Sequence, residues 1–303
     1  MSVDKLPNGV RLGVSPLSWT NEVLDELGGD IPLETCLNQA AAAGYQGVEL
    51  GKKFPREHEE LRATLDGYGL ALISGWYSGF LAERSVEEEM EAVASHAELL
   101  TALGAEVMVY GPCGKMTPGA PLDMSMTERL TLDEDEMDTY ADRLSAFEKR
   151  LLDTYGLKMG YHHHLMMVAE TFDEISRIID RAGCGLLLDT GHAVAAGFDY
   201  AKLIERFGDL ITHIHLKDVR ADRMARVRKE DLSFNDGVRA GMFTVPGDGD
   251  VDFRPLAEFV RASGYRGWLA VEAEQDPARP EAEPQAAVRR ALDFTTSLFG
   301  GQP

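Results

Sequence analysis

Cysteine is scarce in this sequence, and long apolar runs are missing. Cys36, Cys113 and Cys184 are the only cysteines in 303 residues, and no Cys-x-x-Cys pair occurs. Their wide spacing favours neither a disulfide framework nor a zinc ribbon, and it fits a reducing cytosol. The segment from Met1 to Pro7 lacks the apolar core of a secretory signal, and nowhere are there the roughly 18 consecutive apolar residues that a membrane helix needs. We therefore expect a cytoplasmic protein with no membrane partner.

Basic residues are also few compared with acidic residues. The chain has 30 Lys and Arg against 51 Asp and Glu, which gives a formal net charge of −21. Nucleic acids and anionic membranes are bound mainly through Lys and Arg, so this balance disfavours both. A small-molecule ligand is the expected partner, and a homo-oligomer is compatible with the sequence.

Short aliphatic and β-branched runs alternate with longer segments of helical period along the whole chain. This alternation is typical of repeated βα units around a parallel sheet. Eight strands are predicted, at residues 10–14, 47–50, 71–74, 107–110, 158–162, 185–189, 213–216 and 268–272. Ser85 with Glu88 and Thr171 with Glu174 have the spacing of capping boxes, and the acidic run from Asp133 to Glu136 suits a helix start.

No linker or low-complexity tract divides the chain, and neither a G-x-G-x-x-G after the first predicted strand nor a Walker motif is present. We therefore predict one catalytic domain, residues 1–303, with the (β/α)₈ TIM-barrel fold rather than an open doubly wound sheet.

Ionisable side chains follow four consecutive predicted strands. In a TIM barrel such strand ends carry the reacting groups. A charged group at the end of an aliphatic strand is costly unless it is paired or bound to a metal. The residues are His162, His163 and His164, then Asp189 and His192, then His213, His215 and Lys217, and finally Glu272 and Glu274.

One residue from each of these strand ends can converge on a single ion. Because side chains alternate along a strand, His162 shares a face with His164, and His213 shares one with His215. The simplest set of metal ligands is His162, Asp189, His215 and Glu272. Taken alone, Asp189 is equally explained as a helix cap, and a lone histidine is more often a hydrogen-bonded neutral side chain. The coincidence of four strand ends favours the metal site, although His164 remains an alternative ligand from the fifth strand.

The strand-end motifs and several longer strings carry a family resemblance. The chain resembles the xylose-isomerase-like superfamily of metal-dependent sugar isomerases and epimerases, and more narrowly the inosose dehydratases of inositol catabolism. The strings Gly51-Lys52-Lys53-Phe54-Pro55, Ser74-Gly75-Trp76-Tyr77-Ser78 and Glu272-Ala273-Glu274-Gln275-Asp276-Pro277 are the more specific signals. One departure is His162, which stands where the epimerases generally have a glutamate.

The resemblance implies removal of water from 2-keto-myo-inositol (scyllo-inosose), giving 3D-(3,5/4)-trihydroxycyclohexane-1,2-dione. This elimination needs a Lewis acid, a base for the α-proton and an acid for the departing hydroxide. Two imidazoles and two carboxylates suit Mn²⁺ or Co²⁺, which we place ahead of Zn²⁺, Fe²⁺ and Mg²⁺. The catalytic candidates are Glu272, Glu274, His192 and Lys217. The candidates for substrate binding are Glu49, Lys52, Trp76, Tyr161, His164 and His213.

Plainer explanations exist for some of these residues. Trp76 and Tyr161 could pack the barrel mouth, Glu49 and Lys52 could form a surface ion pair, and Lys217 could pair with Asp218. The segment from Lys217 to Arg239 has seven basic and five acidic residues, so it could attract substrate or close as a lid. A mobile solvated loop or a subunit contact explains the same composition.

Three other functions compete with the dehydratase. An isomerase or epimerase would use the same metal and the same first step. An endonuclease IV-type repair enzyme would need more metal ligands and a cationic groove. A non-catalytic polyol-binding protein would keep the scaffold without the chemistry.

Overall fold

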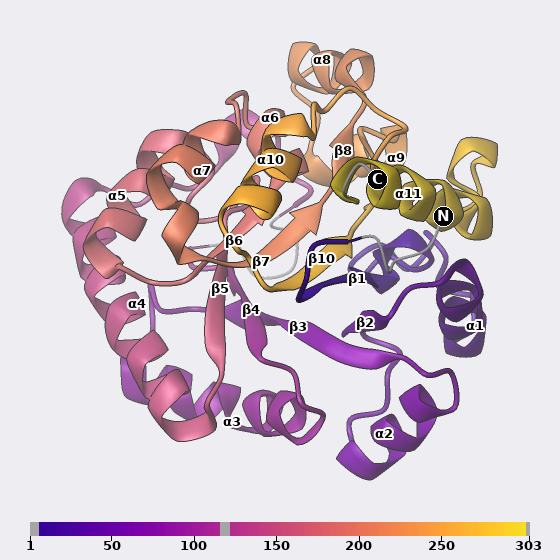
Figure 1. Cartoon of the computed structure of the whole chain (residues 1–303). Helices are drawn as coiled ribbons and strands as arrows, with labels where there is room; N and C mark the ends of the chain where they lie inside the picture. The colour runs from indigo at the N-terminus through magenta and orange to yellow at the C-terminus, as the bar shows by residue number, and fades with distance from the viewer. Residues whose placement is uncertain (1–5, 116–121, 301–303) are drawn as a thin grey trace.

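The computed structural model describes residues 6–115 and 122–300. Eight parallel strands close into a barrel in the order β1-β10-β7-β6-β5-β4-β3-β2, with helices around the outside (Figure 1). The predicted (β/α)₈ barrel is therefore confirmed. The strands are β1 Val10–Val14, β2 Gly47–Leu50, β3 Ala71–Gly79, β4 Val107–Pro112, β5 Lys158–His162, β6 Leu186–Asp189, β7 Ile211–Leu216 and β10 Gly267–Val271.

All eight strand predictions locate a barrel strand, and the largest difference is in β3, which continues to Gly79. The outer helices are α1 Leu33–Ala43, α2 His58–Asp66, α3 Val86–Ala102, α4 Glu134–Tyr155, α5 Phe172–Ala182, α6 Thr190–Ala195, α7 Ala201–Phe207, α10 Arg254–Ala262 and α11 Pro284–Phe299. The short 3₁₀ helices in the described part of the chain are η2 Pro16–Ser18, η3 Met126–Glu128, η4 Gly208–Leu210 and η5 Pro280–Ala282.

Local sequence sets where several of these helices begin. The side chains of Ser85, Thr171 and Asp133 each accept a hydrogen bond from the backbone N–H three residues later. In each case the glutamate at that later position accepts a hydrogen bond from the backbone N–H of the capping residue. These capping boxes satisfy N–H groups that a helix start leaves without an intrahelical partner. They confirm the three predicted helix starts.

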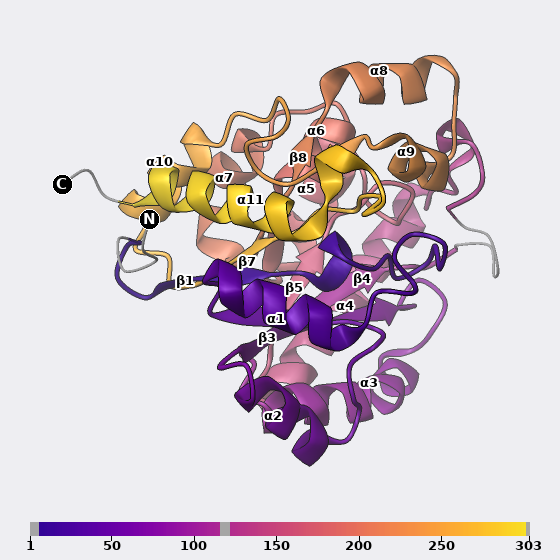
Figure 2. The same ribbon diagram turned by 90° about the vertical axis from the view of Figure 1, so that its right-hand side faces the viewer.

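The chain between β7 and α10 is folded rather than a solvated loop. Residues 218–244, which we call the cap, contain β8 Asp218–Val219, α8 Ala221–Lys229, α9 Phe234–Ala240 and β9 Phe243–Thr244. Strands β8 and β9 pair antiparallel. The two helices lie together at one end of the molecule in both views (Figures 1 and 2).

The cap has an apolar core of its own. Met224, Val227, Phe234 and Val238 face inward and pack on residues from other loops of the same barrel end. Those partners include Leu24, Leu27, Leu122, Leu165 and Met166. The interpretation as a solvated irregular loop is therefore wrong, because α8 and α9 have buried inner faces, and Arg226, Arg228 and Lys229 lie on the exposed side of α8.

Two further observations concern composition. Cys36, Cys113 and Cys184 are free and buried. Among the described residues, no helix is both long enough and apolar enough to span a membrane.

Candidate active site

Four neighbouring barrel strands bring His162, Asp189, His215 and Glu272 together. One ligand atom from each side chain lies within 4.8 Å of the others, and all four residues are buried. Asp189 pairs directly with His215 in the register of β6 and β7. His162 Nε2 and His215 Nδ1 each lie 3.6 Å from Asp189 Oδ2, and His215 Nδ1 is 2.8 Å from Glu272 Oε2. These are the four residues that the sequence singles out as metal ligands, and His164 belongs to a different group.

Asp189 combines the two roles that its sequence context allows. Its Oδ1 accepts a hydrogen bond from the His192 backbone N–H at 2.7 Å, which caps α6. Its Oδ2 is left facing the other three side chains. The helix cap and the strand-end carboxylate are therefore compatible, because each uses a different oxygen.

The chemistry of this group fits a divalent cation. Asp189 Oδ2, His215 Nδ1 and Glu272 Oε2 are buried and make no well-aligned hydrogen bond. Burial would raise the pKa of Glu272, but the charges of His215 and Lys217 lower it to about 2. Burial would lower the pKa of His215, but Glu272 and Glu49 raise it well above its usual value. Two ionised carboxylates thus stabilise positive charge at this point, and a bound metal would supply that charge.

The second nitrogen of His215 is held by Glu49. Glu49 Oε1 lies 3.0 Å from His215 Nε2 and 3.1 Å from His213 Nε2, and it accepts a hydrogen bond from Ser74 Oγ at 2.6 Å. With Nε2–H donating to Glu49, Nδ1 is the nitrogen that faces the ligand group, and it would give up its proton to bind a metal. A carboxylate behind a ligating histidine fixes the ring and its tautomer in this way.

A second cluster lies beside the first and contains Lys217, His192, Glu274 and His164. Lys217 Nζ is 2.8 Å from His192 Nε2, 3.2 Å from Glu274 Oε2 and 3.0 Å from Glu272 Oε2. His164 Nε2 lies 4.0 Å from Glu274 Oε1. The possible Lys217–Asp218 ion pair is not formed, since Asp218 instead accepts hydrogen bonds from backbone N–H groups.

Burial controls the protonation of this second cluster. It raises the pKa of Glu274 to about 7, against the opposing charge of Lys217. It lowers the pKa of His164 to about 3 and that of His192 well below its usual value. For Lys217, Asp189 and Glu272 outweigh burial and raise the pKa well above its usual value. At neutral pH the cluster therefore contains a fixed ammonium, neutral imidazoles and one carboxyl able to gain or lose a proton.

A cavity of about 280 Å³ opens onto both clusters. This size is near the lower end of the range for small-molecule sites. One part of its wall is polar and one part is apolar, the latter formed by Leu17, Val23, Leu122, Met167 and Phe234. The cavity-lining residues among the predicted site residues are Glu49, Lys52, Trp76, His162, His164, His215, Glu272 and Glu274.

Trp76 forms an aromatic edge of this cavity. It is 37% exposed, and its ring lies 5.4 Å from that of His162 and 5.9 Å from that of His164. Gly111 allows this position, because a Cβ there would come within 2.0 Å of the indole. Lys52 also lines the cavity, but its Nζ pairs with Asp25 at 2.7 Å.

Two predicted substrate-binding residues do not line the cavity. Tyr161 is fully buried between the barrel and the helices, where its ring lies 6.4 Å from Tyr140 of α4 and 6.3 Å from Tyr110 of β4. It alternates with His162 along β5 and so faces away from the barrel interior. His213 shares a face with His215 but lies one layer deeper, bonded to Glu49.

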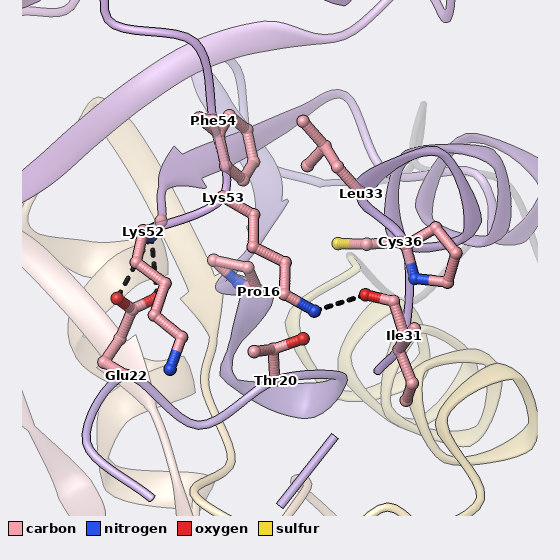
Figure 3. A pocket seen from close by; sticks show the side chains of 11 residues that line it. Pro16, Thr20, Glu22, Ile31, Leu33, Cys36, Lys52, Lys53 and Phe54 are labelled. Carbon is pink, nitrogen blue, oxygen red and sulfur yellow. Dashed lines mark hydrogen bonds between the residues drawn. The ribbon is translucent and has the colours of Figure 1, made fainter. Parts of the chain in front are cut away.

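A smaller pocket beside the cavity has a structural role. Its volume is about 10 Å³, enough for little more than a water molecule. Figure 3 shows Lys53 crossing it, with Nζ directed at the backbone carbonyl of Ile31. Lys53 also donates to the Gly28 carbonyl at 3.2 Å, so it ties the loop after β2 to the loop after β1.

Several cavity-lining residues carry no signal in the sequence. Phe234 and Asn235 come from α9, and Leu122 comes from the long segment after β4. The order of strands and helices locates strand ends, whereas these residues reach the cavity only through the folding of the cap and of the segment after β4 at this end of the barrel.

The comparisons with known proteins agree with this fold. Residues 37–298 match the family model described as Xylose isomerase-like TIM barrel. The rhizopine catabolism protein MocC of Rhizobium meliloti is 43% identical over 270 residues, which are 88% of this chain and 82% of that protein. The inosose dehydratase of Geobacillus thermodenitrificans (strain NG80-2) is 40% identical over 274 residues, 89% of this chain and 92% of the enzyme.

Solved structures show the same barrel at lower identity. The structure described as IOLI protein with a binding zinc atom has a TM-score of 0.68 and 18% identity, and the match covers 95% of this chain and 98% of that one. A D-allulose 3-epimerase from Methylomonas sp. has a TM-score of 0.67 and 16% identity, with 97% and 98% covered. The chain therefore belongs to the xylose isomerase-like TIM barrel family and, within it, to the group that contains the inosose dehydratases.

Proposed function

We propose that this protein is an inosose dehydratase, a hydro-lyase that removes water from 2-keto-myo-inositol to give 3D-(3,5/4)-trihydroxycyclohexane-1,2-dione. Relatives named inosose dehydratase, 37–40% identical over most of the chain, support this function. The observation that carries it is the cavity that opens onto a four-residue ligand group and an adjacent proton-transfer cluster. A polyol ketone needs both kinds of group within reach to lose water.

His162, Asp189, His215 and Glu272 are the residues that would hold a divalent metal. We propose Mn²⁺ or Co²⁺ for this site ahead of Zn²⁺, Fe²⁺ and Mg²⁺, because two imidazoles and two carboxylates are borderline-to-hard ligands. When bound, the metal acts as a Lewis acid that acidifies the proton next to the ketone.

Glu274 is the proposed proton-transfer residue. It lines the cavity, and its pKa near 7 lets it accept the α-proton and donate a proton to the departing hydroxyl. In balance, one C–H bond and one C–O bond break, a C=C bond forms between the two carbons, and the proton and the hydroxide leave together as water. Glu272 is a weaker candidate for the base, because its low pKa makes it a poor proton acceptor.

Lys217 and His192 support Glu274 from behind the cavity wall. Lys217 stays protonated between Glu272 and Glu274, so its role is to stabilise negative charge rather than to donate a proton. His192 is neutral and contacts Lys217 Nζ, so it holds the ammonium in place. His164 presents a neutral imidazole beside Glu274 that can bind a substrate hydroxyl.

The substrate ring would lie among Trp76, Lys52, Glu49 and His164, all of which line the cavity. Tyr161 and His213 are left out of this set, since neither lines it. We further propose a single catalytic domain in residues 1–303 and a cytoplasmic location.

The deciding experiment is turnover of scyllo-inosose. Purified protein is stripped of metal, loaded separately with Mn²⁺, Co²⁺, Zn²⁺, Fe²⁺ or Mg²⁺, and incubated with scyllo-inosose while products are followed by NMR and mass spectrometry. We expect a product lighter by one water, with the highest rate for Mn²⁺ or Co²⁺. A product of unchanged mass would instead identify an isomerase or epimerase.

A further inference from the structure

Asn235 occupies a position in the cavity wall that the proposed chemistry does not use. It lies in α9 of the cap, is 3% exposed, and lines the cavity. Its neighbour Phe234 has its ring 5.1 Å from that of His164. An amide residue of the cap therefore lines the same cavity as Glu274 and His164 of the proton-transfer cluster.

Two contacts fix the orientation of this amide. The backbone N–H of Asn235 donates to the Leu122 carbonyl at 3.0 Å. The side-chain Nδ2 donates to Asp123 Oδ1 at 2.8 Å. A carboxylate only accepts hydrogen bonds, so the nitrogen of the amide must face Asp123 and the oxygen must face away from it.

The oxygen is thereby left for a ligand. No described residue donates a hydrogen bond to Asn235 Oδ1. Asn235 lines the cavity. An amide oxygen at a cavity wall therefore has room for a donor from the ligand.

We propose that Asn235 is a specificity-determining residue whose Oδ1 accepts a hydrogen bond from one hydroxyl of the polyol ring. The site then favours a ring with a free hydroxyl at that position over one with hydrogen or an ether there. This inference rests on the proposed function, because it takes the ring to be that of a polyol ketone.

The surroundings of Asn235 make this selection effective. Leu122 and Phe234 are apolar residues of the same cavity wall, so neither supplies a donor, and a bound ligand without the hydroxyl would leave the amide oxygen unpaired. A site built to bond a hydroxyl rejects the analogue that lacks it more strongly than an apolar pocket rejects an added group.

The experiment compares Asn235→Ala with the unaltered enzyme on scyllo-inosose and on a panel of its monodeoxy and mono-O-methyl derivatives. For the unaltered enzyme we expect one deoxy position to lower kcat/KM by about tenfold to 100-fold, the loss expected when a buried acceptor loses its donor. Asn235→Ala should lower kcat/KM for scyllo-inosose by a similar factor. It should change kcat/KM for that one deoxy derivative by less than about twofold, because the interaction is already missing.

Asp123→Asn is the matched positioning control. An amide at 123 can accept or donate, so the Asn235 side chain is no longer held in one orientation, and we expect an intermediate loss restricted to the same ring position. Thermal unfolding and metal content show whether each variant is folded and loaded. If Asn235→Ala does not fold, Asn235→Ser replaces it.

The proposal is overturned if Asn235→Ala lowers kcat/KM equally for scyllo-inosose and every derivative, or leaves scyllo-inosose turnover unchanged. Failure of the proposed function is a separate outcome, recognised when the unaltered enzyme does not turn over scyllo-inosose. In that case calorimetric binding of scyllo-inositol, a polyol that cannot react, decides the role of Asn235. Weaker binding by Asn235→Ala supports the role, and equal binding contradicts it.

Discussion

Individual residues in this site satisfy two requirements at once, and Asp189 is the simplest case. One oxygen caps α6 through the His192 N–H, and the other faces His162 and His215. The two functions can be separated because asparagine is also a good helix cap.

We predict that Asp189→Asn keeps the fold but loses the metal. Asn retains the oxygen that caps α6, whereas the charged oxygen facing the ligand group is replaced. Metal affinity should fall by more than the roughly 10-fold to 100-fold seen for residues behind the ligands. Titration calorimetry and metal analysis measure it, with Asp180→Asn on the outer helix α5 as the control. Full metal content in Asp189→Asn would contradict the ligand assignment.

Glu49 is predicted to position His215 rather than to bind metal directly. Glu49→Gln replaces a charged acceptor by a neutral one, so the imidazole is less basic and less firmly oriented. Metal affinity should drop by about 10-fold to 100-fold. Gln at this position still fits beside Ser74, so an unchanged far-UV spectrum is the fold control. Unaltered metal affinity would show that the hydrogen bond from His215 to Glu49 is dispensable.

Glu274 gives a pH-dependent prediction for the metal-free protein. Its pKa is about 7 in the folded chain and 4.5 ordinarily, so between these values the folded state holds the proton more tightly. The free energy of unfolding therefore loses a contribution as pH rises from about 4.5 to about 7. Glu274→Gln stays neutral and avoids this loss. Relative to the unaltered protein, the variant should gain up to roughly 3 kcal/mol over that interval.

Urea unfolding at pH 5 and pH 7.5 tests this difference. Glu98→Gln, at an exposed position on α3, is the control and should show a constant difference between the two pH values. A Glu274→Gln curve parallel to that control would argue against a protonated Glu274 near neutrality.

At the scale of elements, one carboxylate connects the start of the cap to the segment that follows the cap. Asp218 begins β8 and accepts hydrogen bonds from the backbone N–H groups of Val219, Gly247, Gly249 and Val251 at 2.8–3.0 Å. Asp218 therefore fixes the segment that leads from the cap to α10, residues 247–251, next to β8 at the start of the cap.

Asp218→Ala should loosen this junction. Several backbone donors would lose their acceptor, so we expect a loss of about 3 kcal/mol or more in the free energy of unfolding. Hydrogen exchange should become faster at Gly247, Gly249 and Val251. Asp250→Ala is the comparison, because Asp250 in the same turn accepts only the Ala221 N–H and is exposed. Equal exchange in the two variants would mean that Asp218 does not hold the turn.

At the scale of the whole molecule, the proposed metal site would couple metal binding to folding. The four ligands span residues 162–272 and meet only when β5, β6, β7 and β10 are side by side in the barrel. Because the unfolded chain has no such site, a metal bound there would stabilise the folded state through mass action.

Removal of the metal should lower the melting temperature. A free metal concentration about 100 times Kd contributes about 2.7 kcal/mol, which corresponds to roughly 5 °C for a chain of this size. Differential scanning calorimetry with a chelator, then with added Mn²⁺ or Co²⁺, measures the shift. Asp189→Asn should show none. A melting temperature unaffected by chelation in the unaltered protein would contradict a metal site at these residues.

The sequence predicted the barrel well because its signals are local. The alternation of strand and helix patterns located all eight strands, and the capping boxes located three helix starts. Strand ends in a parallel barrel meet at one edge, so the order of His162, Asp189, His215 and Glu272 predicted that they would gather.

Depth and long-range packing were not accessible in this way. The period of two puts His213 and His215 on one face, but it does not say that His213 lies a layer below, bonded to Glu49. The same period does separate Tyr161 from His162, so its absence from the cavity was open to prediction from the sequence.

The sequence by itself determined the fold and the strand ends that carry ionisable side chains, because hydrophobic period and helix caps act over a few residues. Only the tertiary structure decided which nitrogen of His215 faces the ligand group, which carboxyl has a pKa near 7 and which cap residues line the cavity. Those properties depend on burial and on hydrogen bonds between residues far apart in the chain, such as Asn235 with Asp123 and His215 with Glu49.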